Sequence, residues 1–172
     1  MHRMKTTLSQ LNLQQHRGLR RHRRAAENRY KNGKGGGGIE SSMAIHRNYG
    51  YFADNEGFII CINLNNLQPV WVHHNYDDTD ATIVVTEENG TPYVYTGCEI
   101  DSQGENGFSW FTKLNGLNGQ QVWSTQIEGK CLNVENKSDS IKSAKKVEGG
   151  MFSTPLIGHG NCEGMIFSNF CI

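Results

Sequence analysis

Short apolar runs alternate along most of the chain with clusters of Asn, Asp and Gly. From Ile39 onward these runs are rich in β-branched and aromatic residues, which is typical of β-strands. The clusters between them favour tight turns, because Asn and Gly tolerate positive φ angles. The pattern therefore predicts an all-β protein. The expected strands are Met43–His46, Tyr49–Ala53, Phe58–Asn63, Pro69–His74, Thr82–Thr86, Tyr93–Glu99, Phe108–Leu114, Gln121–Ile127, Phe152–Ile157 and Met165–Asn169.

Two of the expected hairpins share a repeat that ends in tryptophan. In each, one Asn lies eight residues before the Trp, a second Asn lies five residues before it, and a Val directly precedes it. One large apolar anchor per hairpin, at a fixed place, suits packing between neighbouring sheets. A third unit begins near Met151 and does not reach a third Trp. The repeat anchors are Trp71, Trp123, Asn63, Asn115, Asn66, Asn118, Gly57 and Gly119.

This repeat resembles the quinoprotein (PQQ-like) β-propeller repeat family, over about two to three blades between Met43 and Asn169. That family's unit is a Gly-led strand, a Leu-Asp pair, a Thr-Gly pair and a closing Trp. Asn63 and Asn115 stand at the Asp place, Gly119 keeps the Gly, and Leu67 departs from it. The resemblance implies an incomplete β-propeller of antiparallel four-stranded blades. A propeller closes with about four to eight blades, so we expect a fragment whose remaining blades come from a missing part of the protein or from self-association.

Charge divides the chain into a basic arm and an acidic body. Residues 1–34 carry ten Lys and Arg against Glu27 alone, whereas residues 35–172 carry seven Lys and Arg against sixteen Asp and Glu. The glycine run that ends at Gly38 is typical of a flexible linker. The sequence thus predicts a disordered or weakly helical arm over residues 1–38 and the partial propeller over residues 39–172. Binding of nucleic acid or an anionic surface through the arm is an alternative function.

The sequence lacks the apolar runs of a membrane span or a signal peptide. No run approaches the ~18 residues that a membrane span requires, and the first 15 residues are broken by polar side chains. The family resemblance implies a place outside the cytoplasm, so the compartment stays open. The five cysteines are odd in number and form no CxxC motif, which favours small buried side chains over disulfides or zinc ligands.

Asp77, Asp78 and Asp80 form the densest acidic cluster. Carboxylate oxygens at this spacing can hold calcium. The segment lacks the Gly and Glu of an EF-hand loop, so the alternative is a loop whose Asp side chains cap turns. His73 and His74 precede the cluster and alternate across a strand, which makes a shared metal ion difficult. The sequence predicts no catalytic residue and no cofactor.

The function that the sequence favours is a non-catalytic binding or scaffold module with a protein or carbohydrate partner. The alternative is a fragment of a PQQ-dependent quinoprotein dehydrogenase, because the resembling family includes such enzymes. Their resemblance implies a vicinal cysteine pair, which the sequence lacks: its cysteines are Cys61, Cys98, Cys131, Cys162 and Cys171.

Overall fold

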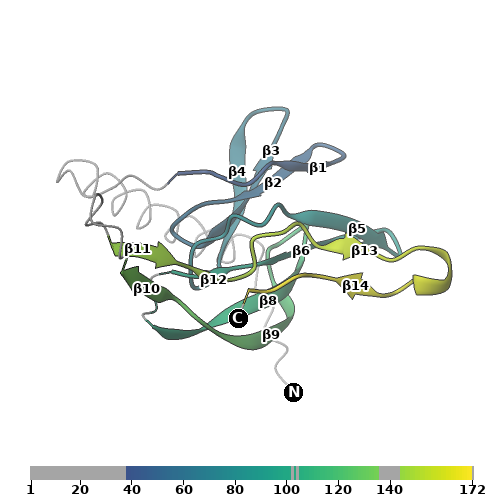
Figure 1. Cartoon of the computed structure of the whole chain (residues 1–172). Coiled ribbons are helices and arrows are strands. Elements are labelled where there is room, and N and C mark those ends of the chain that lie inside the picture. The colour runs from purple at the N-terminus through teal and green to yellow at the C-terminus, as the bar shows by residue number, and fades with distance from the viewer. Residues whose placement is uncertain (1–37, 102, 104, 136–143, 172) are drawn as a thin grey trace, which may run out of the picture. The chain divides into compact units, whose positions relative to one another are not determined.

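The computed structural model describes residues 38–101, 103, 105–135 and 144–171, and they form an all-β structure (Figure 1). Their only helical turn is the short 3-10 segment η1 (Gly160–Cys162). No helix among them is long and apolar enough to cross a membrane. The basic arm predicted over residues 1–38 lies outside the described residues, except for Gly38.

The first sheet is a four-stranded antiparallel meander. Its strands are β1 (Ala44–His46), β2 (Tyr49–Ala53), β3 (Phe58–Asn63) and β4 (Gln68–His74), in the order β1-β2-β3-β4. The predicted bounds of β2 and β3 are confirmed, and those of β1 and β4 differ by one residue. Local signals set these limits, because polar turn residues separate each apolar run from the next.

The second sheet repeats this topology. It contains β5 (Val84–Glu88), β6 (Thr91–Gly97), β8 (Asn106–Asn115) and β9 (Gln121–Lys130), in the order β5-β6-β8-β9. The β5–β6 hairpin turns at Asn89 and Gly90, whose φ angles of +50° and +81° suit a tight antiparallel connection. An inserted segment between β6 and β8 holds the short strand β7 (Glu99–Ile100).

The remaining strands are short pairs. β10 (Leu132–Glu135) pairs with β11 (Ala144–Val147), and β7 pairs with β12 (Gly149–Gly150). β13 (Leu156–Ile157) pairs with β14 (Ile166–Phe167). The prediction of full strands at residues 152–157 and 165–169 was wrong in length. Pro155 lacks an N–H group for a ladder, and glycines interrupt the chain between the two strands.

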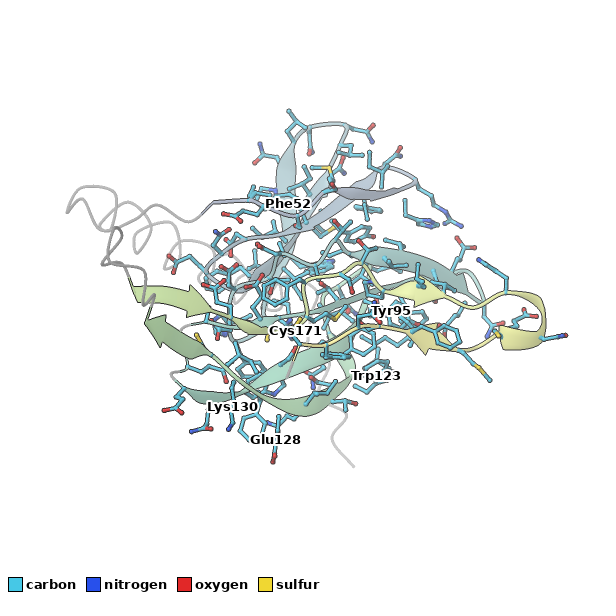
Figure 2. The ribbon with its side chains drawn as sticks, viewed as in Figure 1. Phe52, Tyr95, Trp123, Glu128, Lys130 and Cys171 are labelled. Carbon is cyan, nitrogen blue, oxygen red and sulfur yellow. The ribbon has the colours of Figure 1, made fainter. Side chains whose placement is uncertain are left out.

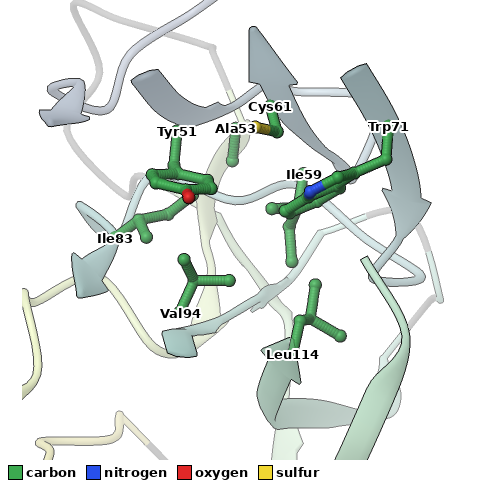
Figure 3. Close-up of a cluster of buried hydrophobic side chains, with 8 residues drawn as sticks. All are labelled: Tyr51, Ala53, Ile59, Cys61, Trp71, Ile83, Val94 and Leu114. Atoms are coloured by element: carbon green, nitrogen blue, oxygen red, sulfur yellow. The ribbon is translucent and has the colours of Figure 1, made fainter. Parts of the chain in front are cut away.

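The two four-stranded sheets pack face to face around the main core. In β2, β3 and β4 the register places Tyr51, Cys61 and Trp71 in one row, so their side chains share a face. Figure 3 shows this face pointing toward Val94 and Leu114 of the second sheet and toward Ile83, which directly precedes β5. The buried cluster comprises Tyr51, Ala53, Ile59, Cys61, Trp71, Ile83, Val94 and Leu114.

The opposite face of the second sheet carries a second core. Tyr95 and Phe111 are buried there, and the partly buried Trp123 packs against them. The C-terminal segment covers this face with Met151 and, among others, Phe170. The described residues therefore stack in three layers: the first sheet, the second sheet and the C-terminal strands. Neither four-stranded sheet closes on itself.

Candidate functional site

The tryptophan repeat is also a repeat of strand pairing. Tyr51 pairs across the sheet with Cys61, which pairs with Trp71; in the second sheet Tyr95, Lys113 and Trp123 stand in the same relation. Each ladder is shifted directly after the residue that faces the Trp. The Tyr–Trp ring centroids are 5.9 Å apart in the first sheet and 6.1 Å apart in the second.

The repeated asparagines act as caps of the turn before each Trp. The side-chain oxygen of Asn63 accepts a hydrogen bond from Asn65 N at 2.9 Å, and that of Asn115 accepts one from Leu117 N at 2.9 Å. The second asparagine of each repeat caps the same turn three residues later. The side-chain oxygen of Asn66 accepts a hydrogen bond from Gln68 N at 3.0 Å, and that of Asn118 accepts one from Gln120 N at 2.9 Å. These side chains stabilise the turn itself, as Asx-turns do.

Two glycine anchors stand where a side chain would not fit. Gly119 has a φ of +70°, and a Cβ there would lie 2.7 Å from the Trp71 ring. Gly57 has a φ of +77°, and a Cβ there would lie 2.6 Å from the Asp77 carbonyl oxygen. Both glycines are therefore required by the backbone and by close packing.

The two tryptophans differ in burial. Trp71 is 1% exposed, and its indole N–H donates to the Gly116 carbonyl oxygen at 2.9 Å. The Tyr51 hydroxyl donates to the same oxygen at 3.1 Å. Trp123 is partly buried against Tyr95 and Phe111. Figure 2 shows Tyr95 and Trp123 on the second sheet.

Asp77 is a structural carboxylate in the acidic loop that follows β4. It is 3% exposed, and its Oδ1 accepts a hydrogen bond from Asp78 N at 3.0 Å. Its Oδ2 accepts bonds from Asp101 N at 3.0 Å and Gln103 Nε2 at 2.9 Å. Oδ2 therefore holds the inserted segment between β6 and β8 onto the loop, whereas Oδ1 stabilises the loop itself.

The sequence reasoning missed Glu99, the most perturbed carboxyl group of this region. Glu99 is 2% exposed on β7, and it lies within hydrogen-bonding reach of Asp80. Burial, followed by repulsion from Asp80, raises the pKa of Glu99 to about 9. Burial, followed by repulsion from Asp80, also raises the pKa of Asp78 to about 6. The pair of Glu99 and Asp80 therefore carries a proton at neutral pH.

The first repeat has an amide where the second repeat has the buried Glu99 carboxyl group. The alignment that superposes Tyr51 on Tyr95 places Asn55 at the position of Glu99. There the Asn55 side-chain amide donates to Glu40 Oε1 at 3.0 Å. An amide donor thus does in the first repeat what a protonated carboxyl group does in the second. Because this equivalence depends on contacts of the folded chain, no signal in the sequence alone identifies Glu99.

The calcium site considered at Asp77, Asp78 and Asp80 remains a prediction. Within the described residues, no group of three or more His, Cys, Asp or Glu side chains is arranged to hold a metal ion. Asp77 already uses both oxygens within the chain, as described above. The Oδ1 atoms of Asp78 and Asp80 are buried without a hydrogen-bond partner.

The cysteines divide into a buried group and an exposed group. Cys61 and Cys98 are buried as predicted, and burial raises the pKa of their thiols to about 12 and about 11. Cys131 is buried too, whereas Cys162 and Cys171 are exposed, which corrects the expectation for these two. They lie in the C-terminal segment, whose strands are too short to enclose them.

No protein-family model matches the sequence, and no curated protein matches it. The inference of function therefore depends on the geometry of the chain. That geometry comprises a repeated sheet with a repeated packing face, a buried acidic pair, and the surfaces left open.

Proposed function

We propose that the chain is a non-catalytic scaffold of stacked β-sheet repeats, built as part of a PQQ-like β-propeller, that serves as a binding module. The observation that carries this proposal is the repeated packing direction. The Tyr–Trp face of the first sheet packs on the second sheet, and the Tyr–Trp face of the second sheet packs on the C-terminal strands. A chain that stacks each sheet on the next in one direction extends by adding further sheets.

The outward face of the first sheet supports the same proposal. Ile62 in the first sheet is equivalent to Leu114 in the second, because each directly follows the residue at which the strand register shifts. Leu114 is fully buried against the first sheet, whereas the outward face of the first sheet bears Ile45 at 65% exposure. Phe52 and Ile60 share a neighbouring row of that face. Phe52 is labelled on the first sheet in Figure 2. An apolar face of this kind favours contact with another sheet.

The chemistry of the described side chains favours a scaffold over an enzyme. The buried thiols have raised pKa values, which disfavour a thiolate nucleophile. Glu99, which has the most strongly raised pKa among the described carboxyl groups, is buried on β7 and lies within hydrogen-bonding reach of Asp80. Nothing in the described part of the chain favours the dehydrogenase alternative.

Self-association of the full chain tests the proposal. We expect purified protein to associate reversibly with rising concentration, measured by light scattering after size-exclusion chromatography. Ile45→Lys should abolish this association without a change in thermal stability, because the side chain is 65% exposed. Val122→Lys, at a position 51% exposed, is the matched control and should still associate.

Two outcomes would overturn the proposal. One is a chain that stays monomeric at all concentrations, or whose association is lost equally with both substitutions. The other is a rise in melting temperature when PQQ and calcium are added together, because that would show a bound cofactor and favour the dehydrogenase alternative.

A further inference from the structure

Five aromatic rings form a continuous row across both sheets, which we call the aromatic row. The Phe58 and His74 ring centroids are 4.9 Å apart, and those of His74 and Tyr76 are 5.8 Å apart. Tyr76 stacks on Trp110 at 4.4 Å with 29° between the planes, and Phe108 lies edge-on to Trp110 at 5.7 Å. The rings come from β3, β4, the following loop and β8.

The outer part of this row is open to solvent. Tyr76 is 51% exposed and Phe108 is 36% exposed. Exposed rings of this size in contact with one another are uncommon on a surface that binds nothing. Tyr and Trp are favoured in binding surfaces, because they combine a large apolar face with a polar group.

The backbone holds Tyr76 in a costly conformation. Its φ is +74°, a region that bulky side chains rarely adopt. The preceding Asn75 anchors it: it is 0% exposed, its N–H donates to the Gly57 carbonyl oxygen at 2.6 Å, and its side-chain oxygen accepts from Thr112 Oγ1 at 2.9 Å. The Tyr76 ring is therefore fixed over Trp110 before any partner arrives, which lowers the entropy that binding must overcome.

Polar side chains run beside the rings on β9. Gln126 pairs directly with Trp110, and Glu128 pairs directly with Phe108. Directly paired residues project from the same face of a sheet. Both Gln126 and Glu128 are exposed. The surface thus combines ring faces with an amide and a carboxylate in the adjacent line.

We propose that the aromatic row binds an oligosaccharide, with a sugar ring on the exposed face of Tyr76 and its hydroxyls bonded to Gln126 and Glu128. A sugar ring presents C–H groups on one face and hydroxyls around its rim, which matches apolar rings bordered by hydrogen-bonding groups. An apolar protein surface would leave the amide and the carboxylate without partners, which is unfavourable. This inference rests on the proposed scaffold function, since the row depends on the stacking of the two sheets.

A glycan array probed with the full-length chain tests the inference, followed by titration of the retained oligosaccharide against tryptophan fluorescence. We expect retention of at least one neutral oligosaccharide. Tyr76→Gly should weaken binding by about tenfold or more while the protein stays folded, because glycine relieves the positive φ. Gln126→Ala should weaken binding by a smaller factor. Phe152→Ala, at an aromatic position 39% exposed outside the row, should bind as the parent does.

Retention of no glycan would overturn the inference, and so would glycan binding that Tyr76→Gly leaves unchanged. Retention of a Lys- and Arg-rich peptide in place of glycans would also overturn it, and would assign the row to cation–π binding. The Ile45→Lys association experiment distinguishes the two proposals. If association depends on Ile45 and no glycan binds, the scaffold survives and the glycan site fails.

Discussion

A single side chain marks where the two repeats differ most sharply. Leu67 stands at the position that Gly119 occupies in the second repeat, and its φ is +55°. Both residues donate their backbone N–H to the first asparagine's carbonyl, from Leu67 to Asn63 at 2.7 Å and from Gly119 to Asn115 at 2.8 Å. The turn therefore imposes a left-handed conformation on a leucine.

Leu67→Gly is expected to stabilise the protein by about 0.5–1 kcal/mol, because it relieves this conformation at the expense of some chain entropy. Leu67 is 70% exposed, so little apolar packing is lost. Gly119→Ala is the opposite change and should destabilise by about 1–3 kcal/mol, since its Cβ would meet the Trp71 ring. Urea denaturation measures both. A less stable Leu67→Gly protein would contradict this account of the turn.

At the scale of elements, the sequence predicts well those strands whose limits are local. β2 and β3 lie at their predicted bounds, because turn residues flank each apolar run. β12 was missed, and Glu99 of β7 was joined to the expected strand Tyr93–Glu99, because the pairing joins Glu99 to Gly150, distant in sequence, and a Gly-Gly pair has no strand pattern. Ala144–Val147, which lies outside the expected strands, pairs with β10 for the same reason: the partner strand, and not the local composition, makes it a strand.

The tryptophan-ending strands β4 and β9 should respond differently to the same substitution. Trp71→Phe is expected to cost about 2 kcal/mol, because it removes the indole bond to the Gly116 carbonyl and leaves a small cavity in the main core. Trp123→Phe should cost less than about 1 kcal/mol, since Trp123 is only partly buried. Chemical denaturation of both variants decides this. Equal losses of stability would contradict this expectation and would mean that the two tryptophans contribute equally to the free energy of unfolding.

At the scale of the whole molecule, the surfaces of interest arise where layers meet, which limits what sequence can predict. The row of Tyr51 and Trp71 could be expected from spacing, since each anchor belongs to one hairpin. Glu99 could not, because its burial depends on the loop after β4 and on β12. The aromatic row was missed for a similar reason: Tyr76 and Trp110 belong to different layers and meet only after the sheets stack.

The stability of the whole chain should therefore fall as pH rises through neutrality. Glu99 has a pKa of about 9 in the folded state against an ordinary value of 4.5, so the folded state binds more protons between these pH values. For one such proton, the free energy of unfolding falls by up to about 1.4 kcal/mol for each unit by which the pH rises. Asp78, at about 6, adds to the loss below that pH. Melting temperatures between pH 6 and pH 9 measure the slope.

Two substitutions at equivalent positions separate the carboxyl pair from every other titrating group. Glu99→Gln supplies to Asp80 the amide donor that Asn55 supplies to Glu40, so it should flatten the slope and raise stability at pH 8. Asn55→Asp creates a carboxyl pair with Glu40 in the first repeat and should steepen the fall of stability with pH. The partner of Asn55 is exposed, so the effect there should be the smaller of the two. A parent profile that is flat or rises with pH would show that Glu99 is ionised in the folded chain, and that a cation or a polar contact compensates its charge.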